Sequence, residues 1–264
     1  DGKEVVQKLR LLTIGSGVGA TASSVMIDRD KILLIGGQQK GVGFSPSNHV
    51  NLIDISDTKR PLVSKMMSMN YARSNANAVV LPTGEVFVNG GHSFNDREFS
   101  VLIPEIYNPE ENSWTELTEG TFRRNYHATS LLLPNGTILV AGGDVWNAEI
   151  FYPPYLFTKD FNNNTVLAKR PEIKNVSKEI NRGEKIKINT SGKISKVTLI
   201  STGSTTHAQG SESKFRDLNY EKISENEIQI KLNNNPNDLQ NGTYLLFVLD
   251  SKGVPSEGKI VFIN

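Results

Sequence analysis

An internal repeat is the feature that most constrains the fold of this chain. Three segments share one pattern, in which an apolar strand, a turn, a second apolar strand and a pair of glycines follow one another: residues 21–37, 75–91 and 127–143. The glycine pairs begin at Gly36, Gly90 and Gly142, 54 and 52 residues apart. A strand, a turn and a second strand make a β-hairpin, so each repeat is expected to be a hairpin that ends in glycines.

A further strand is expected after each glycine pair, in residues 50–55, in residues 105–107 with Trp114 nearby, and in residues 148–152. No long segment has a helical period, and the spacing matches the roughly 50-residue repeat of kelch-type propeller blades. Propellers close with about four to eight blades. Three blades cannot close such a ring, so we expect earlier blades upstream of Asp1; assembly with another chain is the alternative.

The repeat pattern ends before the last hundred or so residues. Residues 1–157 are predicted to form three blades, residues 158–169 an asparagine-rich linker, and residues 170–264 a small antiparallel β-sandwich. The strands expected in the sandwich lie at residues 185–188, 196–200, 227–232, 244–249 and 259–263. The predicted fold class is therefore all-β, with partial propeller blades followed by a sandwich.

Composition excludes several kinds of partner. The 264 residues carry 29 basic and 28 acidic side chains, which gives no electrostatic basis for binding nucleic acid. No stretch approaches the roughly 20 consecutive apolar residues of a membrane span. The chain begins with Asp1 and has no secretory leader, so any signal peptide is expected to lie upstream or to have been removed. There is no cysteine, which excludes disulfides and thiolate ligands within this chain.

The third repeat departs from the other two at one place. Alignment on the turn prolines sets Tyr126 and His127 opposite Ser74 and Asn75, and roughly opposite residues 20 and 21. This position opens the first strand of the hairpin, which in propellers commonly faces the central axis. A phenol beside an imidazole suits Cu(II), which favours nitrogen and oxygen ligands. The alternative is a tyrosine and a histidine that only pack at a blade junction.

The remaining histidines and carboxylates carry weaker signals. His207 lies in a polar loop after an apolar strand and becomes a ligand only with a partner elsewhere, whereas His49 and His92 are expected in surface or local hydrogen-bonding roles. Solvated or turn roles are expected for the carboxylates Asp96, Glu98, Asp144 and Glu149. Motifs for phosphate binding, for zinc proteases and for serine hydrolases are absent from the sequence.

Five landmarks together resemble the galactose oxidase and glyoxal oxidase family of copper radical oxidases, in the family order and with similar spacing. They are residues 124–127 (RNYH) leading into SLLLPNGTILVAGG, then AEIFYPPYLF, RPEI, VTLISTGSTTHAQ and GTYLLFVLDSKGVPS. The resemblance covers nearly the whole chain. It implies a seven-bladed propeller and an immunoglobulin-like early-set sandwich that sends a loop into the propeller axis.

The resemblance also implies a mononuclear copper site and a reaction. By this likeness Tyr126 is the axial tyrosine ligand that accepts the substrate proton, His127 is an equatorial ligand, and His207 is the histidine that the sandwich supplies. The implied reaction is the oxidation of a primary alcohol, aldehyde or carbohydrate by O₂, with hydrogen peroxide as a product, by a secreted enzyme. Copper lowers the pKa of a bound alcohol, and a phenolate is a suitable base for its proton.

One part of the family pattern is missing from this chain. The family uses a second copper-bound tyrosine that is cross-linked to a cysteine, and because this chain has no cysteine, that Tyr–Cys radical cofactor is expected upstream. Residues 38–48 and 92–99 differ from a galactose site, so galactose is not assigned as substrate. Two other functions stay open: a noncatalytic module that binds carbohydrate or protein, and a glycan lyase or hydrolase that uses carboxylates.

Overall fold

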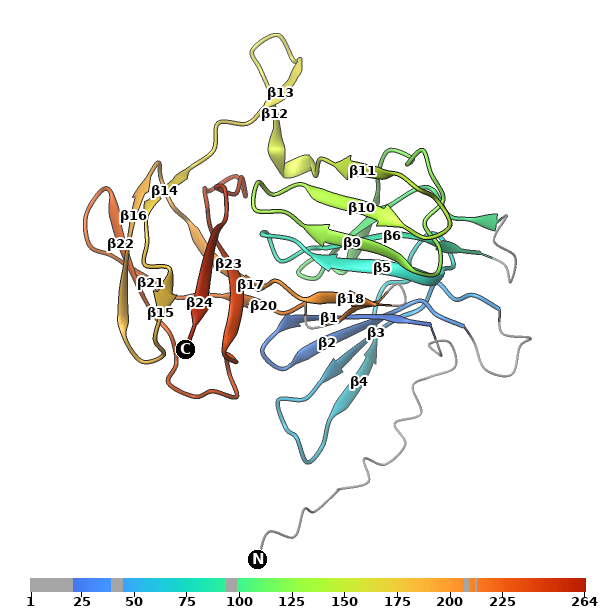
Figure 1. Ribbon diagram of the computed structural model, residues 1–264, viewed down its shortest axis with the longest axis horizontal. Helices are drawn as coiled ribbons and strands as arrows, with labels where there is room; N and C mark the ends of the chain where they lie inside the picture. Colours follow the sequence, from blue (N-terminus) through green and yellow to red (C-terminus); the bar gives the residue numbers. More distant parts are fainter. Residues whose placement is uncertain (1–20, 39–44, 94–98, 207–208, 212) are drawn as a thin grey trace, which may run out of the picture.

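The computed structural model describes residues 21–38, 45–93, 99–206, 209–211 and 213–264. About half of the chain is β-strand, and the regular structure otherwise includes a short 3-10 helix, η2 (Pro154–Leu156). Figure 1 shows a fan of small sheets on one side and a two-sheet sandwich on the other. The predicted all-β fold class is confirmed.

The fan consists of three antiparallel sheets, here called the first, second and third blades, each built from consecutive strands. The first blade contains β1 (Ser23–Asp28), β2 (Lys31–Ile35), β3 (Val50–Asp54) and β4 (Leu62–Lys65). The second blade contains β5 (Ser74–Val80), β6 (Val86–His92), β7 (Glu105–Asn108) and β8 (Ser113–Glu116). The third blade contains β9 (Ala128–Leu132), β10 (Ile138–Gly142) and β11 (Ala148–Phe151).

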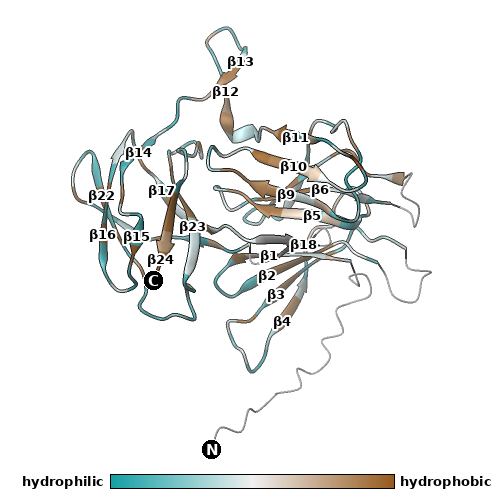
Figure 2. Ribbon diagram, in the orientation of Figure 1, coloured by the Kyte–Doolittle hydropathy of each residue, from teal (hydrophilic) through white to brown (hydrophobic). Residues whose placement is uncertain are grey.

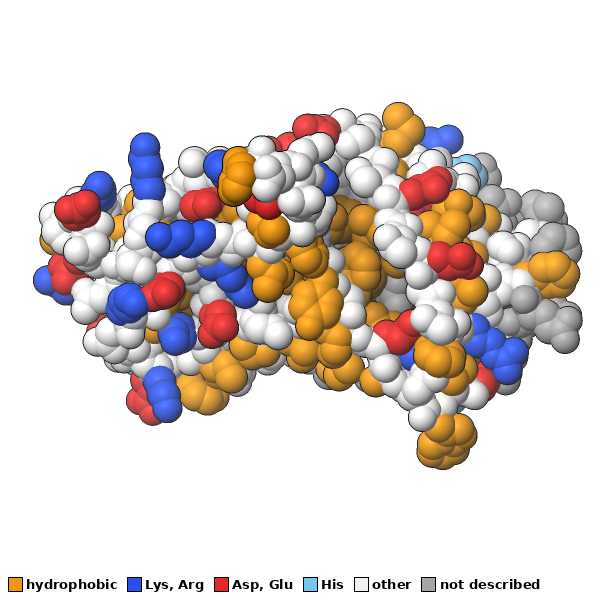
Figure 3. All heavy atoms as spheres, turned by 90° about the horizontal axis from the view of Figure 1, so that it is seen from above, with side chains coloured by type: hydrophobic (Ala, Val, Ile, Leu, Met, Phe, Trp, Pro, Cys, Tyr) orange, Lys and Arg blue, Asp and Glu red, His pale blue; other side chains and the backbone are white. Residues whose placement is uncertain are grey.

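The first strands of the three blades lie side by side, β1 against β5 and β5 against β9. The three blades do not close a ring within the described residues. The second blade has four strands and the third has three, so the outer edge of β11 pairs with no strand among the described residues. Exposed apolar side chains lie along this edge, Ile150 and Tyr152 among them, and apolar groups gather on that side of the molecule in Figure 3.

The glycine pairs are required by the close approach of neighbouring blades. Gly90 has a φ of +66°, and a Cβ atom there would lie 2.2 Å from the carbonyl oxygen of Arg124 in the next blade. Gly36 has a φ of +65° and meets the carbonyl of Arg73 in the same way, at 2.6 Å. Glycine adopts a positive φ without steric cost, and it has no Cβ atom to collide with the neighbouring carbonyl oxygen.

Two packed sheets form the sandwich, and they share a core of buried aliphatic side chains. One sheet has the order β14-β16-β22-β21 and contains β14 (Glu172–Asn175), β16 (Lys185–Ser191), β22 (Glu227–Lys231) and β21 (Tyr220–Lys222). The other has the order β15-β24-β23-β17-β20 and contains β15 (Glu179–Ile180), β24 (Lys259–Ile263), β23 (Gly242–Leu249), β17 (Lys196–Ser201) and β20 (Phe215–Asp217).

The five strands expected in the sandwich are all present. In β16, β22 and β24 buried and exposed residues alternate, as expected for strands with one solvated face. Six consecutive buried residues of β23, by contrast, lie between the sandwich core and the blades. Figure 2 shows apolar residues along many of the strands and polar residues in the turns that join them.

The segment expected to be a linker contains a small hairpin, β12 (Phe157–Lys159) and β13 (Thr165–Leu167). Its turn is closed by Asp160, whose carboxylate accepts hydrogen bonds from the backbone amides of Asn162 and Asn164. The asparagines that suggested a flexible linker are thus the residues of a defined turn, since asparagine and aspartate cap turns with their side chains.

The sandwich packs against the hairpin turns of the blades. Thr198 Oγ1 donates to the carbonyl of Pro82 at 3.0 Å, and Gly258 N donates to the carbonyl of Pro134 at 2.7 Å. Phe247, fully buried in β23, belongs to the same apolar cluster as Val80 of the second blade. Each blade therefore has a sandwich end, at its β-hairpin turn, and a far end, where its first strand begins.

Candidate metal centre

Tyr126 and His127 lie together at the far end of the third blade, immediately before β9. Their rings are stacked, with centroids 3.9 Å apart and planes inclined by 29°. Both side chains are exposed, Tyr126 to 38%. The structure therefore brings the phenol and the imidazole into one accessible pair.

The backbone of His127 explains how two adjacent side chains can face the same way. Neighbouring side chains in a regular strand point to opposite faces. His127 has a φ of +66°, in the left-handed region, and this turns its ring onto that of Tyr126. Histidine, asparagine and aspartate enter this region more readily than most residues, at a cost of about 1–2 kcal/mol.

The same backbone conformation recurs in all three blades. Thr21 has a φ of +68° and Asn75 a φ of +57°, and these are the residues that the repeat alignment sets opposite His127. The left-handed residue is thus a property of the blade, present whether or not a metal ligand stands there. What distinguishes the third blade is the pair of side chains at this position and the segment that leads into it.

In the second blade the equivalent side chains are already occupied. Ser74 is fully buried and hydrogen-bonds to Thr21 Oγ1 at 2.7 Å, and Asn75 Nδ2 lies 3.2 Å from His92 Nε2. The local hydrogen-bonding role expected for His92 is confirmed by this contact. A side chain at position 74 enters a fully buried position, whereas Tyr126 is exposed.

The third blade gains this room through one additional residue, Asn125, between Arg124 and the aligned pair. Asn125 is buried, and its amide exchanges hydrogen bonds with Ser100 Oγ at 2.9 and 3.2 Å. Asn125 therefore fills the position in the blade that would otherwise hold the first residue of the pair, and Tyr126 lies outside it.

Oxygen and nitrogen donors of this kind fit a copper ion. The pair supplies one phenol oxygen and one imidazole, a donor set that Cu(II) accepts readily. Among the residues that the structure describes, no group of three or more histidine, cysteine, aspartate or glutamate side chains could hold a metal. A complete site at Tyr126 and His127 thus requires further ligands, and the predicted ligand His207 lies outside the described residues.

The strands that flank position 207 are described. β18 (Ser204–Thr206) and β19 (Gln209–Ser211) pair antiparallel, and this hairpin leaves the sandwich to lie against the first strands of the blades, β1, β5 and β9. Met26 and Lys214 form a parallel bridge, so the segment that contains β19 runs in the same direction as β1. β19 contacts the first strands of all three blades, β1, β5 and β9.

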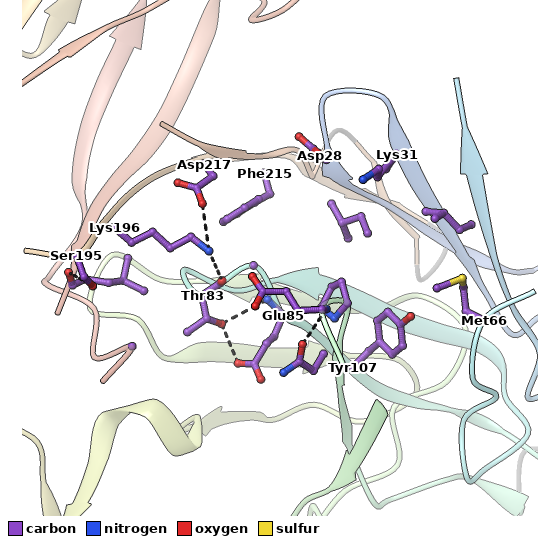
Figure 4. Close-up of a pocket in the computed structure, with 18 of the residues that line it drawn as sticks. Asp28, Lys31, Met66, Thr83, Glu85, Tyr107, Ser195, Lys196, Phe215 and Asp217 are labelled. Atoms are coloured by element: carbon purple, nitrogen blue, oxygen red, sulfur yellow. Dashed lines mark hydrogen bonds and ion pairs between the residues drawn. The ribbon is translucent and has the colours of Figure 1, made fainter. Parts of the chain in front are cut away.

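A separate cleft lies at the sandwich end of the blades, where the first blade, the second blade and the sandwich meet (Figure 4). Its volume is about 710 Å³. Lys196 spans it, with Nζ 3.2 Å from the carbonyl of Thr83, 3.3 Å from Asp217 and 5.6 Å from the ring centre of Phe215. Burial raises the pKa of Glu85 at its edge. Because it lies at the opposite end of the strands from His127, this cleft is not part of the candidate metal centre.

Sequence reasoning missed the role of Glu149. The solvated or turn roles expected for Asp96 and Glu98 concern residues outside the described part of the chain. Glu149 was expected to be solvated or in a turn. Its side chain is 25% exposed and accepts hydrogen bonds from Arg124 NH2 at 3.3 Å and from Thr121 N at 2.8 Å. The expectation was wrong because Arg124, 25 residues away in sequence, gives no local signal of the pair.

Comparisons with known proteins give matches along most of the chain. The family model described as glyoxal oxidase N-terminus matches residues 27–164, and the model described as galactose oxidase-like, early set domain matches residues 170–263. A galactose oxidase of Gibberella zeae is 31% identical over 92% of this chain and 37% of its own length. The aldehyde oxidase GLOX of Vitis pseudoreticulata is 29% identical over 54% of this chain and 32% of its own length.

A solved structure matches the fold over most of the chain. It is a fungal alcohol oxidase of the AA5 family in complex with copper, with a TM-score of 0.83 and 26% identity, over 92% of this chain and 54% of that one. The chain spans about a third of the length of the curated relatives it matches.

Proposed function

The chain belongs to the galactose oxidase and glyoxal oxidase family of copper radical oxidases, and we propose that it forms part of an oxidase of primary alcohols or aldehydes. An alcohol and O₂ would give an aldehyde and hydrogen peroxide; an aldehyde, water and O₂ would give an acid and hydrogen peroxide. Small alcohols, aldehydes and carbohydrates are the proposed substrate classes.

The observation that carries the proposal is the stacked Tyr126–His127 pair at the far end of the third blade. His127 would donate a ring nitrogen to the ion and Tyr126 its phenol oxygen. Copper, when bound, supplies Lewis acidity and one-electron chemistry to this site. Tyr126 Oη would then accept the hydroxyl proton of the substrate, a role for which its exposed position suits it.

The sandwich hairpin supports His207 as a further ligand. β19 contacts β1, β5 and β9, and each of these strands begins at or close to the left-handed residue of its blade. In the sequence His207 stands between β18 and β19, and both strands contact β9, the strand that His127 immediately precedes. This placement fits the loop that the family resemblance implies.

The domain organisation follows from the same proposal. Residues 1–157 would be kelch-type blades, residues 158–169 a connecting segment and residues 170–264 the early-set sandwich. No helix in the described part of the chain is long and apolar enough to cross a membrane. We propose secretion on the family resemblance alone.

The test is Cu(II) binding by the native protein, followed by electron paramagnetic resonance. One Cu(II) per chain with hyperfine coupling from two imidazole nitrogens is expected. His127→Ala and His207→Ala should each remove one nitrogen, and His49→Gln, which alters a histidine outside the proposed site, should leave the spectrum unchanged. Spectra that are identical in all three variants would refute the site.

A noncatalytic binding module is the second candidate, and the Tyr–Cys cofactor distinguishes the two, since this chain contains no cysteine. The oxidase requires that the Tyr–Cys cofactor come from outside these residues. Peroxide production from alcohols or aldehydes under O₂, together with a cross-linked Tyr–Cys peptide by mass spectrometry, would support the oxidase. Copper binding without either would support the binding module.

A further inference from the structure

Two buried arginines occupy equivalent positions in successive blades, Arg73 and Arg124. The backbone carbonyl of each arginine accepts a hydrogen bond from the second glycine of the pair in the preceding blade. Gly37 N donates to Arg73 O and Gly91 N donates to Arg124 O, both at 2.7 Å. Each guanidinium donates to the first glycine of its own blade. Both arginines therefore connect the glycine pairs of two adjacent blades.

The two guanidinium groups differ in their remaining partners. Arg73 donates from both Nε and NH2 to Glu105, at 3.2 and 2.8 Å. Arg124 instead donates to the backbone and side-chain oxygens of Asn147, at 3.2 and 2.7 Å, and contacts Glu149 at 3.3 Å. Its Nε is buried without a hydrogen-bond partner among the described residues. Arg124 thus ties down the loop between β10 and β11 as well as its own strand.

A short chain of hydrogen bonds leads from Arg124 to the backbone of His127. Arg124 NH1 donates to the carbonyl of Gly142 at 3.0 Å. The same peptide group contains the amide of Gly143, which donates to the carbonyl of His127 at 3.1 Å. The guanidinium therefore fixes the peptide that holds His127 in its left-handed conformation.

We propose that Arg124 is a positioning residue for the metal ligand His127, acting through the Gly142–Gly143 peptide. That Arg124 affects copper binding rests on the proposed function. That Arg124 holds the backbone of His127 rests on the hydrogen bonds alone. The fork geometry of the guanidinium is needed, because a lysine ammonium cannot bind Gly142 and Asn147 at once in the same plane.

Arg124→Lys in the native protein is the test, with Arg73→Lys as the matched control. Without metal, hydrogen exchange of the Gly143 amide should become about tenfold faster in Arg124→Lys, since loss of outer-shell support loosens a site. With metal, Cu(II) affinity should fall by about 10- to 100-fold and the copper hyperfine coupling should change. Arg73→Lys should leave the Gly143 exchange rate and the copper spectrum as in the native protein.

The outcomes separate the two proposals. If the native protein binds no copper, the proposed function fails, and the exchange rate of Gly143 still decides the role of Arg124. A folded Arg124→Lys with native exchange and a native spectrum would overturn the inference, as would an equal copper effect in Arg73→Lys. If Arg124→Lys does not fold, Asn147→Ala, which removes one acceptor, should shift the spectrum in the same direction by less; an unchanged spectrum would overturn the inference.

Discussion

The second and third blades share a framework and differ in what they do with it. In the second, the carboxylate of Glu105 accepts from Arg73 and from the amide of Asn70; in the third, Glu149 accepts from Arg124 and from the amide of Thr121. The first ion pair is completely buried, whereas Glu149 is 25% exposed. The second blade is therefore closed by its ion pair, and the third is more open and bears the exposed Tyr126–His127 pair.

The comparison shows that the candidate site uses a backbone feature that all three blades share, whatever side chains they carry there. Every blade places a left-handed residue at the start of its first strand. In the second blade, burial of Ser74 and the bond between Asn75 and His92 use up that position. The third blade has the additional residue Asn125 before this position and leaves Tyr126 and His127 accessible there, as the proposed metal-binding pair requires.

The largest expected difference between the blades is the cost of breaking each ion pair. Arg73→Met leaves Glu105 buried without its charged partner, which should cost about 3–5 kcal/mol of unfolding free energy. Arg124→Met should cost about half as much, because water can reach Glu149. Urea unfolding monitored by tryptophan fluorescence measures both.

A double variant checks the reason for this difference. Arg73→Met combined with Glu105→Leu replaces the pair by apolar groups of similar volume and should recover most of the loss. Equal losses for Arg73→Met and Arg124→Met, or no recovery in the double variant, would show that exposure of the carboxylate is not what distinguishes the two blades.

A smaller effect on stability is expected from substitutions at His127, the left-handed residue of the third blade. His127→Gly should be more stable than His127→Val by about 1–2 kcal/mol, since a β-branched residue is strained at a positive φ and glycine is not. Both variants remove the imidazole and should lose copper to the same extent. Thermal unfolding and Cu(II) titration together separate backbone strain from loss of the ligand.

The second blade offers the matching pair of variants. Asn75→Gly and Asn75→Val should differ in stability by a similar amount, because Asn75 has nearly the same φ as His127. A difference confined to one blade would mean that the backbone conformation is not a common property of the repeat, and the alignment of His127 with Asn75 would lose its meaning.

The sequence was sufficient to predict the strands, the glycine pairs and the departure at Tyr126 and His127, because each has a local or a repeated signal. It could not predict the left-handed backbone at His127, since histidine shows no preference strong enough to reveal it. The sequence also could not predict that Arg124 binds Asn147 and Glu149, because partners more than 20 residues apart meet only in the folded blade. The hairpin at β12 and β13 was hidden by an asparagine-rich composition that is typical of both turns and linkers.

The smallest difference concerns the hairpin turns, where Glu85 in the second blade stands opposite Thr137 in the third. Burial, with smaller contributions from Glu111 and Glu110, raises the pKa of Glu85 above its ordinary value of 4.5. The folded state therefore binds this proton more tightly than the unfolded state does, so stability falls as pH rises from 4.5 through the raised pKa. Glu85→Gln has no proton to lose, and its unfolding free energy relative to the native protein should rise over that window. Glu225→Gln, in an exposed bend, controls for the change of charge alone. If the two variants follow the same pH dependence, burial at the second turn does not destabilise the ionised carboxylate, and the two turns are equivalent in this respect.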